Sequence, residues 1–223
     1  MSGAGPGLGE EGLPAPWQAA LEEAWEAYLR GSYPIGACVA DASGRVLARG
    51  RNRLGEERRV DGVISGHRLG HAEVNALLEL PDLDAQTGRA LTLYTTTEPC
   101  PMCLGALLMA RVGGLAYAAA DPWAGHSEAL TLTAYPSRKG VRLGRAPAAV
   151  IRACLLLELT FHLDRGMAPD HGYLTVHRAQ EPWVYAAAEA LHRSGALAAL
   201  RDRQAPLAGG LALLDGSWPV ARA

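Results

Sequence analysis

The sequence predicts an α/β protein built on a mixed sheet of parallel and antiparallel strands. A β-hairpin pattern near the N-terminus is followed by strand patterns that alternate with helical patterns, and this order places helices on both faces of a sheet. Of the 223 residues, 49% are hydrophobic and 20% are charged, which is a globular composition with ample material for a core. The length exceeds one average domain, so we expect a single α/β core with an appended piece.

The first predicted elements are a helix and a hairpin that follow a short tail. Residues 1–15 are rich in Gly, Pro and Glu, and we expect them to form a disordered tail. Apolar residues recur near helical spacing over 17–30, and this amphipathic helix should stop at Gly31. Strands over 35–40 and 45–49, separated by a turn, then form the hairpin.

The central segments are predicted to complete the sheet and to supply two more helices. The stretch 52–70 is polar and dotted with glycine, so we expect a loop. Helices are predicted over 71–80, which a proline closes, and over 101–110, where a proline occupies the favoured first position. The apolar, β-rich segment 91–97 is typical of a buried strand, and 113–120 is a further candidate strand.

The C-terminal part of the chain has a different, helical character. A strong helix is predicted over 146–166, and the segment 182–203 should form two helical pieces that Gly195 separates. We therefore divide the chain into the tail, a core domain over 16–160 and a mainly helical extension over 161–223. The sequence leaves open whether this extension caps the core or forms a small subdomain.

Charge and hydropathy exclude several classes of protein. A formal net charge of −2 and a pI near 6.4 give no global electrostatic footprint for nucleic acid. Five arginines within 49–59 could meet phosphate, but the acidic residues among and after them favour a solvated loop. No apolar run approaches the roughly 18 residues of a membrane span, and the N-terminus has no leader pattern. We expect a soluble, cytoplasmic protein without a membrane partner.

Two thiols, one imidazole and one carboxyl are predicted to converge at two helix starts. Cys100 and Cys103 lie at i and i+3 around a helix start, so their side chains share one side. His71 and Glu73, at i and i+2, cannot share a lateral face but can both reach a point off the amino end of their helix. Two thiolates and a neutral imidazole suit Zn²⁺, and three protein ligands leave a fourth position for water. Glu73 would then act as a proton shuttle beside the metal.

The same residues carry a resemblance to a known family. The segments "HAE" at 71–73 and "PCPMC" at 99–103 match the H-x-E…P-C-x-x-C signature, and the chain resembles the zinc-dependent cytidine-deaminase-like superfamily. It looks closest to the branch of guanine deaminases and tRNA adenosine deaminases. The resemblance implies a three-layer α/β/α sandwich around a five-stranded mixed sheet, and a homodimer. It also implies one zinc ion per chain, held by His71, Cys100 and Cys103, with Glu73 as the catalytic residue.

The resemblance extends to residues that would bind the substrate. The hairpin "YPIGACVADASGRVLARGRN" is similar to that of the same branch, and this makes Asn52 a candidate base ligand. From the residues alone, a role of Asn52 in satisfying backbone groups at a strand end is favoured. Trp123 could stack on a purine at the pocket mouth or could equally be core filler. The other candidates for the substrate pocket are Pro34, Ile35, Ala72, Thr97 and Asp121.

These observations predict a hydrolase that replaces the amino group of a free nucleobase or nucleoside by oxygen and releases ammonia. A purine-like substrate is favoured by the similarity to guanine deaminases, and a nucleic acid substrate is possible but not favoured. The alternative enzyme is a tRNA adenosine deaminase. A non-catalytic zinc-binding module would have no use for Glu73, and a redox protein using the two cysteines would leave His71 and Glu73 unexplained.

Overall fold

The computed structural model describes residues 12–58 and 60–218, so the predicted tail over 1–15 lies largely outside the described residues. The chain forms two compact units, an N-terminal unit over Leu13–Ala146 and a C-terminal unit that begins at Pro147. The predicted boundary after residue 160 falls inside a helix that belongs wholly to the C-terminal unit. We describe each unit by itself.

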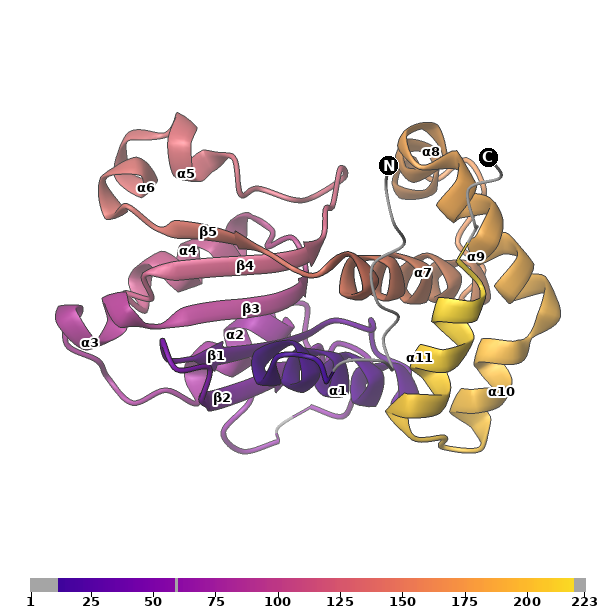
Figure 1. Ribbon diagram of the computed structural model, residues 1–223, viewed down its shortest axis with the longest axis horizontal. Helices are drawn as coiled ribbons and strands as arrows, with labels where there is room; N and C mark the ends of the chain where they lie inside the picture. Colours follow the sequence, from indigo (N-terminus) through magenta and orange to yellow (C-terminus); the bar gives the residue numbers. More distant parts are fainter. Residues whose placement is uncertain (1–11, 59, 219–223) are drawn as a thin grey trace. The chain divides into compact units, whose positions relative to one another are not determined.

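A five-stranded mixed sheet forms the centre of the N-terminal unit, as predicted (Figure 1). Its order is β2-β1-β3-β4-β5. β1 runs antiparallel to both β2 and β3, whereas β3, β4 and β5 are parallel to one another. The strands are β1 Gly36–Ala40, β2 Val46–Arg51, β3 Thr92–Thr97, β4 Gly114–Ala119 and β5 Arg142–Arg145.

Helices cover both faces of this sheet, and two glycines make their close approach possible. α1 (Ala15–Leu29) packs on one face, and α2 (Ala72–Leu78) and α4 (Pro101–Met109) belong to the other layer. A Cβ on Gly36 would lie 2.1 Å from the carbonyl oxygen of Ala20 in α1. A Cβ on Gly50 would lie 2.2 Å from the backbone nitrogen of Ala76 in α2. Glycine is therefore required at both contacts, and the expected three layers are present.

The main core lies between the sheet and the layer of α2 and α4. Leu93 of β3, Leu107 of α4 and Leu115 of β4 are fully buried in one cluster. On the other face, Trp17 of α1 packs edge-on against Tyr94 of β3, with ring centroids 5.2 Å apart. Residues adjacent in β3 thus face different layers, because side chains alternate along a strand.

Three short helices and the last strand were not predicted from the sequence. They are α3 (Ala85–Ala90), α5 (Ala129–Leu132), α6 (Ala134–Lys139) and β5. Asp84 is the N-cap of α3, and its side chain accepts hydrogen bonds from the N–H groups of Gln86 and Thr87. β5 has the sequence RLGR and is largely exposed, so it lacks the apolar pattern of a buried strand.

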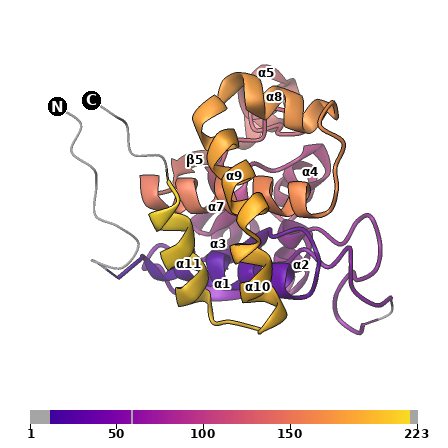
Figure 2. The same cartoon turned by 90° about the vertical axis from the view of Figure 1, so that its right-hand side faces the viewer.

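Five helices make up the described part of the C-terminal unit (Figure 2). They are α7 Ala148–Asp164, α8 Gly172–Gln180, α9 Pro182–Ser194, α10 Ala196–Asp202 and α11 Leu207–Gly216. α9 and α11 pack against α7, and α8 packs against α9. Gly195, at a φ of 65°, separates α9 from α10 as predicted. None of the described helices is both long and apolar enough to cross a membrane.

Candidate active site

Two helix starts bring His71, Cys100 and Cys103 together. His71 is the N-cap of α2, and Cys100 is the N-cap of α4. Pro101 fixes the first turn of α4, because its ring presets the helical φ and it has no N–H to leave unpaired. Cys103 lies in that first turn and is fully buried. The predicted convergence at two helix amino ends is therefore what the fold produces.

The spacing of the three donor atoms matches the edges of a zinc tetrahedron. The two sulfur atoms lie 3.6 Å apart, and Nδ1 of His71 lies 3.7 Å from Sγ of Cys100 and 3.4 Å from Sγ of Cys103. Zn–S bonds of about 2.3 Å and a Zn–N bond of about 2.0 Å require edges of about 3.8 Å for S–S and about 3.5 Å for N–S. The donor set and its geometry thus fit Zn²⁺ with one position left open.

The pKa values of the two cysteine thiols are shifted in opposite directions. The hydrogen bond with Cys103, aided by His71, lowers the pKa of Cys100 to about 4. The hydrogen bond with Cys100 and burial raise the pKa of Cys103. Metal binding requires both thiols to be deprotonated, because the thiolate is the form that ligates the metal.

Glu73 is a buried carboxyl beside the three donors. It lies in the first turn of α2 and is 3% exposed. Its Oε1 accepts a hydrogen bond from Oγ1 of Thr95 (3.2 Å), and Cys103 donates to its Oε2 (3.3 Å). Burial raises the pKa of this carboxyl, so the group can hold a proton more readily than an exposed glutamate.

Sequence reasoning missed Thr95 and Asn75, which hold the site in place. Thr95 shares the core-facing side of β3 with Leu93 and contacts Glu73 from the strand. Oδ1 of Asn75 accepts from the N–H of Ile64 (2.8 Å), and its Nδ2 donates to the carbonyl oxygens of Ile64 (3.1 Å) and Arg51 (3.2 Å). This tethers the loop before His71 to α2. For Asn75, a polar residue among apolar ones in α2 was the available signal, whereas Thr95 is one of four threonines in β3 and does not stand out.

Asn52, Ile35 and Thr97 lie at the same edge of the sheet as the cysteines. β2 and β3 both run antiparallel to β1, so their carboxyl ends and the start of β1 meet there. The backbone N–H of Gly36 donates to Oγ1 of Thr96 and links the two segments (3.1 Å). Oδ1 of Asn52 accepts from the N–H of Leu54 (3.0 Å), so this oxygen serves the backbone. A contact between Asn52 and a base stays a prediction.

The remaining predicted pocket residues differ in burial. Pro34, Ala72 and Thr97 are buried, Ile35 is partly buried, and the Trp123 ring is 58% exposed. Ala72 is the first residue of α2 and packs into the core cluster.

Asp121 and Trp123 belong to a turn that Glu98 holds at the end of β4. Oε2 of Glu98 accepts from the N–H of Asp121 (3.2 Å), and its Oε1 accepts from the N–H of Ser127 (3.1 Å). Oδ1 of Asp121 in turn accepts from the N–H of Trp123 (2.9 Å). Glu98 therefore shapes the loop that presents Trp123, and Asp121 builds its turn.

The loop between β2 and α2 contains a cavity of about 360 Å³ that carries positive charge. Its lining residues are Leu54, Arg58, Gly66, His67 and Arg68. Among the described residues, the group of donors close enough to hold a metal contains His71 and the two cysteines but not His67. His67 is exposed, and its Nδ1 accepts from the N–H of Leu69 (3.1 Å).

Comparison with known proteins agrees with this metal centre. Residues 15–119, from α1 to the end of β4, match the family model described as the cytidine and deoxycytidylate deaminase zinc-binding region. This segment, which makes up most of the N-terminal unit, is similar to that family. The match covers both helix starts, so the suspected resemblance and the zinc cofactor are confirmed at the level of the family.

Each of the curated relatives matches this chain over only part of its own length. The chain is 43% identical over 120 residues to a tRNA(Ile)-lysidine synthase of Deinococcus radiodurans, a match that covers 51% of this chain and 19% of that protein. A cytosine deaminase of Candida albicans is 34% identical over 92 residues, a match that covers 41% of this chain and 56% of that protein. A tRNA-specific adenosine deaminase of Bacillus subtilis is 36% identical over 112 residues, a match that covers 50% of this chain and 64% of that protein. The chain thus spans less than two thirds of each relative.

A solved structure supports the fold. NE0047 in complex with 2,6-diaminopurine superposes with a TM-score of 0.51 at 23% identity, covering 70% of this chain and 84% of that one. This likeness shows the shared three-layer architecture.

Proposed function

We propose that the protein is a zinc-dependent hydrolytic deaminase of a free nucleobase or nucleoside, with a purine-like substrate. The observation that carries this proposal is the position of Glu73. Its carboxyl contacts Cys103 and is buried, yet it does not belong to the group of metal donors. A zinc site that only stabilised the fold would use a fourth protein ligand and would need no proton carrier.

The chemistry divides between the metal and Glu73. His71, Cys100 and Cys103 would hold the zinc ion, which would supply Lewis-acid activation of a water molecule. This water attacks the amino-bearing carbon of the substrate. Glu73 takes the proton of this water and delivers it to the adjacent ring nitrogen. It then carries the second proton to the departing amino group, so that one water is consumed and one ammonia leaves. Thr95 orients the carboxyl through its hydrogen bond to Oε1.

Residues at the same sheet edge would bind the base. The exposed ring of Trp123 offers a stacking surface for a heterocycle, and Asn52 offers an amide at the end of β2. Pro34, Ile35, Ala72 and Thr97 would form apolar and hydroxyl walls. Asp121 would act through the turn that positions Trp123. The proposal includes a homodimer, which light scattering of the purified protein would test.

The decisive test measures ammonia release across matched panels of free bases, nucleosides and nucleotides. We expect turnover of at least one free base or nucleoside with an exocyclic amino group, and metal analysis should give about one zinc per chain. Turnover of purines above pyrimidines supports the purine assignment. No ammonia from any member by a protein that is loaded with zinc would contradict the proposal.

A tRNA adenosine deaminase is the second candidate, and one observation favours it. Arg58, His67 and Arg68 line the cavity in the loop that leads directly to His71, where phosphates of a bound RNA could lie. The Bacillus subtilis relative is named for this activity. Filter binding of tRNA over a range of salt concentrations separates the two, because phosphate contacts make affinity fall steeply with salt. Inosine formation in tRNA without turnover of free compounds would select this alternative.

A further inference from the structure

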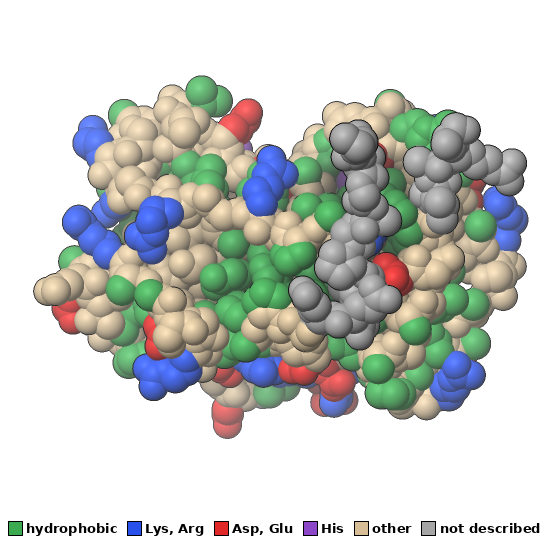
Figure 3. All heavy atoms as spheres, in the orientation of Figure 1, with side chains coloured by type: hydrophobic (Ala, Val, Ile, Leu, Met, Phe, Trp, Pro, Cys, Tyr) green, Lys and Arg blue, Asp and Glu red, His purple; other side chains and the backbone are tan. Residues whose placement is uncertain are grey.

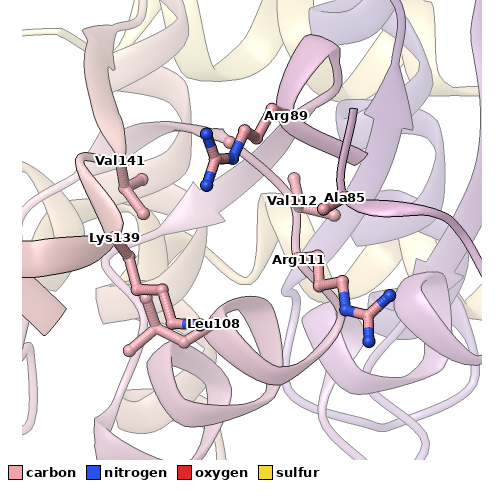
Figure 4. A pocket seen from close by; sticks show the side chains of 8 residues that line it. Ala85, Arg89, Leu108, Arg111, Val112, Lys139 and Val141 are labelled. Atoms are coloured by element: carbon pink, nitrogen blue, oxygen red, sulfur yellow. The ribbon is translucent and has the colours of Figure 1, made fainter. Parts of the chain in front are cut away.

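A second basic site lies at the opposite end of the sheet from the metal centre. α4 starts beside the carboxyl end of β3 and runs back along the sheet, so its last turn lies near the amino ends of the parallel strands. A cavity of about 110 Å³ opens there (Figure 4). We call it the basic pocket, and its lining residues are Ala85, Arg89, Leu108, Arg111, Val112, Gly113, Lys139 and Val141.

Two cationic side chains reach into the basic pocket from different elements. Arg89 comes from α3 and Lys139 from the end of α6; in Figure 4 the Arg89 guanidinium extends toward Val141, and the Lys139 side chain extends toward Leu108. The Lys139 ammonium also lies over the ring of Tyr135, 4.8 Å from its centroid. The guanidinium of Arg111 points away from both and donates to the carbonyl oxygen of Leu83 (3.1 Å). Leu108, Val112 and Val141 supply apolar walls.

The region around the pocket has positive charge without matching carboxylates. The segments 85–90, 108–113 and 134–146 contain six cationic residues and no acidic one. These are Arg89, Arg111, Arg138, Lys139, Arg142 and Arg145. Blue side chains gather at the left of Figure 3, where Figure 1 places α3, α6 and β5. The neighbouring acid Asp84 caps α3, and its charge interacts with that of Arg111, the cation that points away from Arg89 and Lys139.

Exposed cations elsewhere in the N-terminal unit do have carboxylate partners, unlike the six cations around the pocket. Arg30, Arg45 and Arg49, which are all exposed, each lie within 3.0 Å of a carboxylate oxygen. Within 12–58 and 60–218, none of the six cations around the pocket makes an ion pair. Cations held around a concave, partly apolar site without counter-charges are suited to an anion.

We propose that the basic pocket binds the phosphate group of a small free ligand. Two cations on opposite walls match a doubly charged oxyanion better than a singly charged carboxylate, and they can donate to several of its oxygens. A cavity of about 110 Å³ admits one such group, with the rest of the ligand leaving over the apolar rim. The site is separate from the metal centre, so it requires no turnover by that centre.

Isothermal calorimetry with inorganic phosphate and pyrophosphate at constant ionic strength tests this site in the full-length, zinc-loaded protein. We expect saturable binding with a Kd of about 1 mM or tighter, and tighter binding of pyrophosphate. Replacing both cations, Arg89→Gln with Lys139→Gln, should weaken binding by about tenfold or more, because it removes two charged donors. The matched control is Arg138→Gln, which neutralises the residue beside Lys139 that does not line the pocket, and it should change Kd by less than about twofold.

A charge-conserving double variant and a binding measurement with a short oligoribonucleotide complete the test. Arg89→Lys with Lys139→Arg should keep phosphate binding, which separates loss of charge from loss of fold. Absence of saturable binding below about 10 mM, or equal binding by the double Gln variant, would overturn the proposal. The same holds if a short oligoribonucleotide binds through Arg89 and Lys139 while phosphate and pyrophosphate do not bind.

Discussion

At the scale of single residues, Glu73 is the group whose replacement should separate catalysis from metal binding. Glu73→Gln keeps the size of the side chain and its acceptor for Thr95 but removes the ability to carry a proton. We expect ammonia release to fall by about 10² to 10⁴ in kcat, with zinc content near one per chain. Turnover assays and metal analysis on the same preparation measure both quantities.

The control for this replacement is a glutamate in the same helix region that does not reach the metal donors. Glu79 is exposed at the end of α2, and its Oε2 accepts from the N–H of Arg49. Glu79→Gln should therefore leave kcat within about twofold, since surface substitutions have small effects. Full activity of Glu73→Gln would refute the mechanism, and loss of zinc from it would assign Glu73 to metal binding instead.

The sequence predicted the metal residues because short motifs place each of them at the start of a helix. A proline at a helix start and the spacing of His71, Cys100 and Cys103 place all three side chains at helix ends. Their supporting partners come from distant segments, as when Thr95 contacts a carboxyl 22 residues earlier in the chain. Such pairs depend on the register of strands, and spacing along one chain does not encode it.

At the scale of elements, the packing of α2 on the hairpin decides where His71 and Glu73 lie. Gly50→Ala would place a Cβ 2.2 Å from the backbone nitrogen of Ala76, so α2 must move away from β2. We expect a loss of about 1–3 kcal/mol in the free energy of unfolding, together with weaker zinc binding. Urea unfolding and competition with a chromogenic chelator measure the two effects.

Gly105→Ala provides the matched control within the same unit. Gly105 lies inside α4, and a Cβ there would meet no atom within 4 Å. Alanine favours a helix over glycine by about 1 kcal/mol, so this variant should be as stable as the wild type or more stable. Equal stability of the two variants would show that the contact between α2 and β2 is more compliant than the distances indicate.

The elements that the sequence predicted are those with a strong apolar pattern. β3 and β4 bury most of their residues, and α1 buries one clear face. β5 pairs with β4 although its exposed sequence RLGR has no such pattern, so only the partner strand explains its position. α3, α5 and α6 are too short for helical periodicity to be detected.

At the scale of the whole molecule, the sequence predicted two parts but placed their boundary inside α7. Residues on several sides of α7 are buried. The apolar pattern of its sequence therefore indicates that other elements pack around this helix, but it does not indicate which ones. α9 and α11 pack against it, and the C-terminal unit therefore includes the whole helix.

The C-terminal unit is expected to lose stability in mild acid because of His162. This α7 side chain is 6% exposed, and its ring lies 4.3 Å from that of Tyr173, centroid to centroid. Burial, together with the charges of the nearby His177, His171 and Arg165, lowers the pKa of His162 to about 4. The unfolded chain, with a histidine pKa near 6.5, therefore takes up a proton before the folded chain does.

Stability from His162 is thus complete above about pH 6.5 and falls as the pH drops toward about 4, by up to about 3 kcal/mol. Amide hydrogen exchange in α7, α8 and α9, corrected for the intrinsic rate at each pH, measures this loss within the C-terminal unit. His162→Gln stays neutral and should flatten the profile over this range, whereas His67→Gln, an exposed residue of the N-terminal unit, should not. An unchanged profile in His162→Gln would refute the role of His162.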